Sequence, residues 1–456
     1  MVPSWLSALT KLFPKGVVAA DAETLAAHAG DAWFAKTLPQ AVVFPRKAED
    51  VAAVLGFAKK RKIPVTARGA GRGYVGGCVP KRHGIVVSLT KMNRVLEINP
   101  VDGVGVVQPG VITGEFQAQA LKLGLLYPPD PASLKECSLG GNIATNAGGP
   151  RCLKYGVTRH YVLGLQVALA DGTLVRVGGR TQKNKSGWDL VGMFVGSEGM
   201  LGIVTEITLR LIPAPPARAA LAASFGNASQ AAAGVQHILA NGFLPSALEL
   251  ADRFTLEAAR RHLGSEHLPA GDAHLLIEID GQPDSVQLEA RALAEILKNG
   301  GALEVTIATT EAGCEQLWDL RRQFSASLKA TGLTKLNEDI CVPRSRLVDL
   351  FAFTAKLQKK YDVEIASFGH AGDGNIHVNI MADMSLPGVK ARSDKALDEL
   401  FRQVLKWGGA ITGEHGIGLA KLPWWKEAAS PELRKLHATI KKALDPQHLL
   451  NPGKFV

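Results

Sequence analysis

The sequence predicts an α+β protein with two domains and a terminal segment that folds back onto the first of them. Helix-like and strand-like apolar patterns alternate along the chain, which is typical of this class. The prolines of Pro213-Ala-Pro-Pro216 remove backbone donors and stiffen the chain, so they predict a domain boundary. A chain of 456 residues also exceeds what one core usually holds. The predicted divisions are residues 1–215, 216–425 and 426–456.

In the first predicted domain, apolar residues recur at helical spacing before the first glycine-rich loop and form strand-like runs after it. A second stretch resembles a βαβ unit and ends at the prolines. The predicted elements are helices at 48–62 and 113–123, strands at 63–67, 84–89 and 103–107, and a βαβ-like stretch from 162–177 to 202–209.

In the second predicted domain, helical patterns at residues 229–241, 285–297 and 311–330 alternate with strands such as 274–279. Residues 445–454 contain too many turn-forming residues for a helix. They are predicted to return to the first domain.

Composition excludes several classes of protein. The net charge of +10 is not accompanied by basic runs interleaved with aromatic residues, and residues 59–62 fit the exposed end of a helix, so nucleic-acid binding is not expected. The five cysteines include no CxxC pair, which argues against a disulfide framework or a cysteine metal site. Residues 5–18 lack the apolar core of a signal peptide, and no window reaches the roughly 18 apolar residues of a membrane span. A cytoplasmic protein is expected, with peripheral contact to the inner membrane face and a homodimer left open.

Glycines cluster in loops that suit a phosphate-bearing ligand. Residues 68–77 follow a predicted strand, but no helix opens after them as a Rossmann turn requires. Such a loop can still present several backbone N–H groups to a pyrophosphate. Residues 128–149 form a second loop, whose small residues leave room for a large flat ligand, and residues 196–205 join a glycine turn to a buried strand.

These three elements resemble, in order and spacing, the FAD domain of the vanillyl-alcohol-oxidase/PCMH superfamily over residues 40–215. The resemblance implies a PCMH-type FAD-binding domain in two parts. Some members tether FAD to a histidine in the first loop, where this chain has Arg72, so noncovalent FAD is implied. The implied cofactor-binding residues are Arg68, Gly69, Ala70, Gly71, Arg72, Gly73, Gly76, Gly77, Pro129, Ser133, Gly140, Gly141, Asn146, Gly149 and Ile203, together with Asn451 of the terminal segment.

Two histidines and a glutamate form a candidate metal site. His370 and His377 are seven residues apart across a glycine turn, a spacing that predicts a strand end, a turn and a strand with both rings in one site. Glu414 and His415 lie together in another glycine turn. Two imidazoles and a carboxylate with one open position are typical of a catalytic divalent metal such as zinc, manganese or iron.

With residues 335–339 and 451–454, these motifs resemble the C-terminal domain of the FAD-linked D-2-hydroxyacid dehydrogenases, a family that includes D-lactate dehydrogenases, the glycolate oxidase flavin subunit and D-2-hydroxyglutarate dehydrogenase. The resemblance implies an α+β substrate domain. It implies that His370, His377 and Glu414 bind metal, that His415 is the base, that Arg321 and Lys335 hold the substrate carboxylate, and that Asn379 lines the site. Taken alone, Arg321 and Arg322 fit a solvated helix face equally well, and Asp373 and Asn375 fit a turn-shaping role.

The expected function is oxidation of a small D-2-hydroxycarboxylate, of the D-lactate, glycolate or 2-hydroxyglutarate class, to the 2-oxo acid. The metal would lower the pKa of the substrate hydroxyl, and a histidine with an ordinary pKa of about 6.5 could then take its proton while flavin N5 accepts the hydride. Electrons would leave to a quinone, a cytochrome, an electron-transfer flavoprotein or a partner subunit. Three alternatives stay open: a metal-independent alcohol or phenol oxidase, a flavin or scaffold subunit of a larger glycolate-oxidase-like complex, and a flavin-free metallohydrolase.

Overall fold

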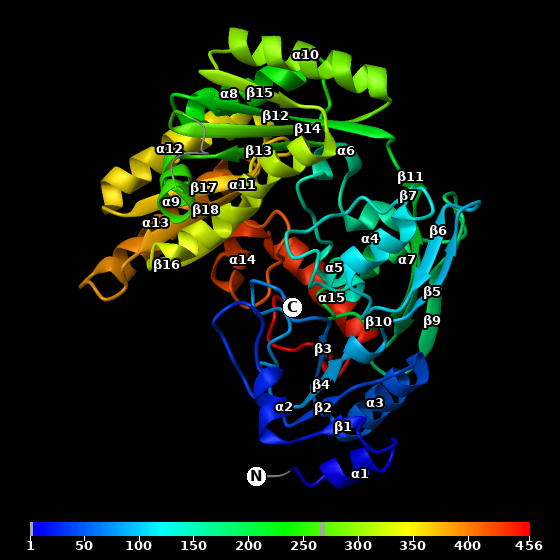
Figure 1. Ribbon diagram of the computed structural model, residues 1–456. Coiled ribbons are helices and arrows are strands. Elements are labelled where there is room, and N and C mark those ends of the chain that lie inside the picture. The colour runs from blue at the N-terminus through cyan, green and yellow to red at the C-terminus, as the bar shows by residue number, and fades with distance from the viewer. Residues whose placement is uncertain (1–2, 265–269) are drawn as a thin grey trace. The chain divides into compact units, whose positions relative to one another are not determined.

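The structure is a computed structural model that describes residues 3–264 and 270–456 (Figure 1). The chain folds as two compact units. Unit 1 comprises Met1–Gly148, Val157–Ala214 and Glu414–Val456, and unit 2 comprises Gly149–Gly156 and Pro215–Gly413. The division after Ala214 falls in the proline stretch. Compared with the predicted domains, residues 149–156 join unit 2, and the last segment of unit 1 begins at Glu414 instead of residue 426.

The first sheet of unit 1 has the order β1-β2-β4-β3. Strands β2, β4 and β3 are parallel because helix α3 carries the chain from β2 across to β3. Helix α3 confirms the predicted helix at 48–62, and its apolar face packs on this sheet in one core. The elements are α1 (Leu6–Thr10), β1 (Val18–Ala19), α2 (Ala22–Ala27), β2 (Ala41–Val43), α3 (Ala48–Arg61), β3 (Val65–Arg68) and β4 (Ile85–Ser88).

The second sheet of unit 1 has the order β5-β6-β10-β8-β9, and all its pairs are antiparallel. The predicted βαβ-like stretch is therefore wrong. The turn at Asp171-Gly172 makes β8 and β9 a hairpin, and β10 runs antiparallel to β8. The elements are η1 (Leu89–Lys91), β5 (Val95–Asn99), β6 (Val104–Val107), α4 (Thr113–Leu121), β7 (Leu125–Leu126), α5 (Leu139–Thr145), η2 (Thr158–Tyr161), β8 (Val162–Ala168), β9 (Leu174–Gly178), α7 (Leu190–Phe194), β10 (Ile203–Arg210) and β11 (Ile212–Pro213).

The last segment of unit 1 contains α14 (Leu422–Ala428) and α15 (Pro431–Leu444), after which the chain is non-helical as predicted. It reaches the first sheet, where Leu450 forms a parallel bridge with Val65 of β3. The buried Lys441 ammonium donates to Asp445 and to the carbonyls of Met200 and Leu450. These hydrogen bonds stabilise the position of the last segment.

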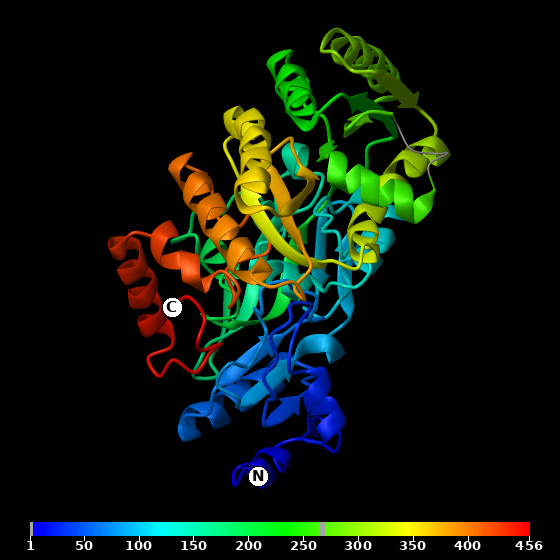
Figure 2. The same ribbon diagram turned by 90° about the vertical axis from the view of Figure 1, so that its left-hand side faces the viewer.

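Unit 2 is built on one antiparallel sheet with the order β15-β12-β14-β13-β17-β18-β16. Helices α9 and α11 pack together on one face, and α8, α12 and α13 pack near one another; Figure 2 shows α12 in yellow beside α13 in orange. The elements are α6 (Cys152–Tyr155), β12 (Ala217–Phe225), α8 (Ala228–Ala240), β13 (Ala247–Ala251), α9 (Arg253–Leu263), β14 (Ala273–Gly281), α10 (Pro283–Asn299), β15 (Glu304–Ala308), α11 (Glu311–Ala330), β16 (Thr334–Cys341), η4 (Arg344–Arg346), α12 (Leu347–Tyr361), β17 (Glu364–His370), β18 (Asn375–Ala382) and α13 (Val389–Lys406).

Alternation along β18 separates an apolar face of this sheet from a polar one. Side chains of successive strand residues point to opposite faces. Ile376, Val378 and Ile380 therefore share one face, and His377 and Asn379 share the other. Both faces are buried, so the polar side chains of the second face need hydrogen-bond partners.

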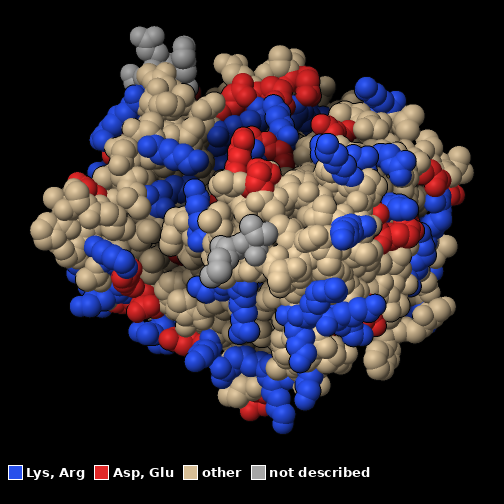
Figure 3. Space-filling view, turned by 90° about the horizontal axis from the view of Figure 1, so that it is seen from below, with Lys and Arg blue, Asp and Glu red and all other residues tan. Residues whose placement is uncertain are grey.

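Basic side chains outnumber acidic ones on the face of the molecule that Figure 3 shows, which is the side on which the N-terminal helix α1 lies. Residues 59–62 are exposed at the end of α3, as predicted. Among the described residues, no helix is both long and apolar enough to cross a bilayer.

Candidate active site

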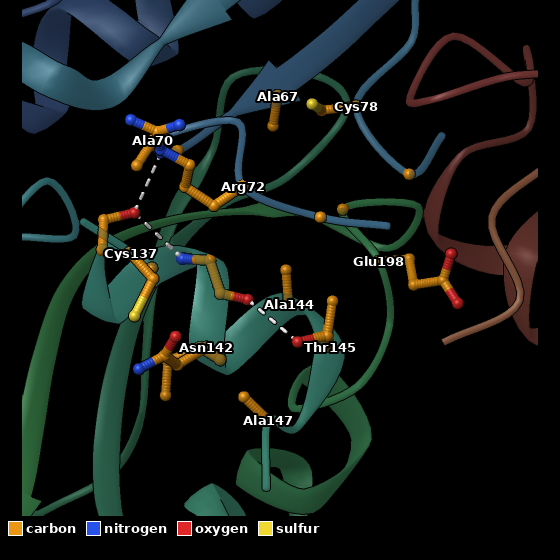
Figure 4. A pocket seen from close by; sticks show the side chains of 18 of the residues that line it. Ala67, Ala70, Arg72, Cys78, Cys137, Asn142, Ala144, Thr145, Ala147 and Glu198 are labelled. Carbon is orange, nitrogen blue, oxygen red and sulfur yellow. Dashed lines mark hydrogen bonds between the residues drawn. The ribbon is translucent and has the colours of Figure 1, made fainter. Parts of the chain in front are cut away.

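Unit 1 contains a cavity lined by the three predicted glycine-rich segments (Figure 4). Its second segment was predicted as a loop but contains the short helix α5, because Ser138 caps the N-terminus and Asn146 ends the helix in the left-handed region. The Ser138 hydroxyl also accepts from the backbone N–H of Ala70, so it joins the first segment to the second. Gly69 has to be glycine here, since a Cβ would lie 2.5 Å from that hydroxyl oxygen.

The walls of this cavity are built from small side chains and backbone. In Figure 4, Ala67, Ala70, Ala144, Thr145 and Ala147 border the space, and none of them is large enough to fill it. Glycine-rich backbone in such loops can offer N–H groups to a pyrophosphate. The cavity therefore fits a long ligand with a flat ring system and an anionic bridge, as FAD has.

Ten of the predicted cofactor-binding residues line this cavity. Arg72 is one of them, and its guanidinium also forms an ion pair with Glu136 at 3.0 Å, with both side chains about half exposed. The full set is Gly69, Ala70, Gly71, Arg72, Gly73, Gly77, Ser133, Gly140, Gly141 and Ile203.

The other predicted cofactor residues do not line this cavity, and most of them support it. The Arg68 guanidinium donates hydrogen bonds to the Gly30 carbonyl and to the sulfur of Cys78. Pro129 accepts from Gln117, and Asn146 accepts from the backbone of Arg159. The remaining three are Gly76 of the first loop, Gly149, which belongs to unit 2, and Asn451, whose amide donates to the carbonyls of Gly77 and Glu198.

His415 and Glu414 lie on the wall of the same cavity. The His415 ring packs against Tyr74 of the first loop, with ring centroids 5.4 Å apart, and its Nε2 lies 3.7 Å from a Glu414 oxygen. Downstream, the Val75 carbonyl accepts from the N–H groups of Leu419 and Ala420. The first loop therefore holds the segment that carries His415.

Glu198 is a cavity-lining residue that the sequence patterns missed. Its buried carboxylate accepts from the N–H groups of Ile417 and Gly418, two and three residues after His415. Burial raises the pKa of Glu198, and these two N–H groups and the nearby Lys454 and Lys421 oppose that rise. Its position in Gly196-Ser197-Glu198-Gly199, among turn residues in a pocket-lining segment, was the only signal.

His370 and His377 lie side by side in unit 2, as the spacing predicts. β17 ends at His370, and His377 is the third residue of β18. The two rings are 5.7 Å apart between centroids, and each residue offers a ring nitrogen within 4.8 Å of the other. Both side chains are buried. The Nδ1 of His370 is 2.6 Å from the Glu249 carboxylate, so its Nε2 is the atom that can bind a metal.

Arg321 and Lys335 reach the same region of unit 2. Both cations lie near the Phe368 ring, at 5.0 and 5.7 Å from its centroid, and Phe368 packs against His377 at 5.4 Å. Arg321 is thus partly buried, with 13% of its side chain exposed, whereas 49% of the Arg322 side chain is exposed. Burial first, and then the charges of Lys329 and Arg321, lower the pKa of Lys335 to about 8.

Asn379 lies on the histidine side of the sheet and is fully buried. Its amide nitrogen donates to the carbonyls of Ala366 and His377. Within residues 3–264 and 270–456, its Oδ1 has no hydrogen-bond partner. A buried acceptor without a partner is costly, so this oxygen fits contact with a bound ligand or water. Asn375, in contrast, binds Asp339 and the Ile340 carbonyl, which agrees with a turn-shaping role.

Both halves of the chain match known protein families. Residues 39–178 match the FAD binding domain family, and residues 214–455 match the family described as FAD linked oxidases, C-terminal domain. The chain belongs to the FAD-linked oxidases. This FAD-linked oxidase is therefore an oxidoreductase that binds FAD, as the cavity and the resemblance predicted.

The relatives of this FAD-linked oxidase cover nearly its whole length. It is 38% identical to the glycolate oxidase subunit GlcD of Bacillus subtilis over 92% of this chain and 89% of that protein. It is 37% identical to the D-lactate dehydrogenase of Archaeoglobus fulgidus over 91% of each chain. The structure of p-cresol methylhydroxylase with substrate bound matches 99% of this chain and 96% of its own, with a TM-score of 0.81 and 20% identity, which confirms the PCMH-type fold.

Proposed function

We propose that this FAD-linked oxidase oxidises a small D-2-hydroxycarboxylate, of the D-lactate, glycolate or 2-hydroxyglutarate class, to the 2-oxo acid. The observation that carries the proposal is the polar sheet face of unit 2, where paired imidazoles, two partly buried cations and an unsatisfied amide oxygen lie together. Cations and a metal site side by side suit a ligand with a carboxylate next to a hydroxyl. Relatives named glycolate oxidase subunit and D-lactate dehydrogenase support this substrate class.

We also propose that His370, His377 and Glu414 bind a divalent metal such as zinc, manganese or iron. The donor set fits, because His370 and His377 offer ring nitrogens within 4.8 Å of each other on a buried sheet face. Glu414 follows Gly413, whose N–H donates to Asp339 of β16, and Asp339 is paired in register with His377. Glu414 is the next residue after Gly413, which is hydrogen-bonded to the strand paired with His377. This proximity supports Glu414 as the third ligand.

When bound, FAD supplies a two-electron acceptor and the metal supplies a Lewis acid that polarises substrate oxygens. Arg321 and Lys335 would hold the substrate carboxylate through charge-assisted hydrogen bonds, and Asn379 Oδ1 would accept from a substrate or water donor. His415 would take the hydroxyl proton as the Cα–H bond breaks, so that the proton stays on the protein and the electron pair leaves with the Cα hydrogen. The buried Phe368 and Ala366 would exclude water from this region.

Two-electron reduction of FAD requires an external acceptor for each turnover. We propose a quinone, a cytochrome, an electron-transfer flavoprotein or a partner subunit in this role. Relatives named glycolate oxidase subunit, among them those of Bacillus subtilis and Escherichia coli at 38% and 37% identity, favour a second form of the proposal. In that form, this chain is the flavin subunit of a multi-subunit complex.

A substrate panel tests the proposed function. Purified protein with FAD bound is mixed anaerobically with the D and L forms of lactate and 2-hydroxyglutarate, with glycolate, and with a phenol such as 4-ethylphenol. We expect at least one D-2-hydroxyacid or glycolate to bleach the flavin, and the L forms and the phenol to fail. Bleaching by the phenol alone would favour an alcohol or phenol oxidase, and a colourless protein would favour the metallohydrolase.

The pH dependence of substrate affinity tests the role of Lys335. With a pKa of about 8, its ammonium is charged below pH 8 and about nine-tenths neutral at pH 9. If this charge holds the carboxylate, KM for the best hydroxyacid should rise about tenfold from pH 7 to pH 9. The matched control is Lys335→Arg, because a guanidinium stays charged throughout this range and should flatten the rise. A KM that is equally flat in the unmodified enzyme would remove Lys335 from the carboxylate site.

A further inference from the structure

Glu249 lies between a proposed metal ligand and a proposed substrate-binding residue. Its side chain is 2% exposed. One carboxylate oxygen is 2.6 Å from Nδ1 of His370, and the other accepts from Nε of Arg321 at 2.5 Å. One buried carboxylate therefore contacts both groups.

Strand register produces this arrangement. Glu249 on β13 is paired directly with His370 on β17, so the two side chains lie on the same face of the sheet. Leu248 and Leu250, its neighbours in the strand, point to the opposite face and are buried in the apolar core. Arg321 approaches from helix α11, which covers the Glu249 face.

We propose that Glu249 is a positioning residue that sets the ring orientation and tautomer of His370 and fixes the direction of the Arg321 guanidinium. This inference rests on the proposed function, since it assumes that His370 binds metal and Arg321 binds the substrate carboxylate. Through Glu249, the metal ligand and the carboxylate-binding cation share one rigid support.

The chemistry of the three groups gives the reason. A carboxylate only accepts hydrogen bonds, so Nδ1 of His370 has to carry the proton and Nε2 keeps the lone pair that a metal needs. The same carboxylate neutralises Arg321, whose partly buried charge would otherwise lack this partner. A glutamine has the same shape, but its amide oxygen could accept from only one of these donors. Its NH2 group, which is itself a donor, would face the other one.

The test is Glu249→Gln in the full chain with FAD bound. After chelator treatment, Zn²⁺ binding is measured by equilibrium dialysis, and KM and kcat are measured with the best hydroxyacid of the panel. We expect a 10- to 100-fold loss of Zn²⁺ affinity, the range typical of carboxylates that orient metal-binding histidines. We also expect KM to rise more than kcat falls, because Arg321 loses its orientation.

Glu278→Gln is the matched control. Glu278 is also a buried carboxylate of this sheet, on the neighbouring strand β14, and it accepts from Arg151, Arg218 and Trp318 but from no histidine in the described residues. We expect Glu278→Gln to lower the thermal midpoint and to leave Zn²⁺ affinity unchanged. Equal loss of Zn²⁺ affinity in both variants would show a structural role only and would overturn the inference.

Histidine NMR keeps the inference testable if Glu249→Gln does not fold. In the metal-free unmodified enzyme, the ¹⁵N signals of His370, assigned by their loss in His370→Gln, should show a proton on Nδ1. A proton on Nε2 instead would overturn the inference. Absence of Zn²⁺ and Mn²⁺ binding by the unmodified enzyme would overturn the metal site and this inference together, whereas normal binding with an unchanged Glu249→Gln affinity would overturn only the role of Glu249.

Discussion

Replacement of His415 by asparagine should slow anaerobic flavin reduction by the best 2-hydroxyacid by about 10²- to 10⁴-fold, the usual contribution of a positioned general base. The ring lies on the cavity wall beside Tyr74, and asparagine keeps a polar group there without a basic nitrogen. Stopped-flow absorbance of the flavin measures the rate, and the flavin spectrum before mixing shows that FAD is still bound.

His448→Asn is the control for this variant. His448 is an exposed histidine of the same unit, and its φ of 51° is a conformation that asparagine adopts readily. We expect it to reduce its flavin at the unmodified rate. Undiminished reduction in His415→Asn would remove His415 as the base and would direct attention to other groups of the cavity wall.

Removal of the proposed metal should be the other large effect. A Lewis acid in such a site contributes several kcal/mol, so dialysis against a chelator should slow flavin reduction roughly a hundredfold or more. Added Zn²⁺ or Mn²⁺ should restore the rate, and the flavin spectrum should not change. Full activity after exhaustive chelation would support a metal-independent oxidase on the same scaffold.

A pair of histidine variants separates metal loss from damage to the fold. His377→Gln removes a proposed ligand, whereas His274→Gln replaces another buried histidine of the same sheet, whose pKa burial lowers to about 4. We expect both to lower the thermal midpoint, and only His377→Gln to abolish rescue by added metal. Rescue of both variants would exclude His377 as a ligand.

Patterns local in the sequence predicted much of the fold. Helices α3 and α11 follow from apolar spacing, and the strand-turn-strand around His370 and His377 follows from the glycines between them. The two errors have local causes as well. Helix α5, whose ends are set by Ser138 and Asn146, was not predicted because its glycines and small polar residues are typical of a loop. The hairpin was not predicted because its turn at residues 171–172 is short.

The residues that were missed act over long sequence separations. Glu249 meets His370 only because β13 pairs with β17, 121 residues later, and Glu198 reaches Ile417 over 219 residues. A single acidic residue in a buried strand gives no sign of its partner until the sheet order is known. The proposed metal-ligand and base motifs were visible because their residue types cluster locally, whereas the residues proposed to orient them do not.

The amide of Asn451 joins the carbonyls of Gly77 and Glu198, and the first of these hydrogen bonds spans 374 residues of sequence. During synthesis on the ribosome, these two hydrogen bonds therefore cannot form until residue 451 has been added and has left the exit tunnel. We expect tight cofactor capture to follow the docking of this segment, with earlier folding stages holding the dinucleotide only weakly.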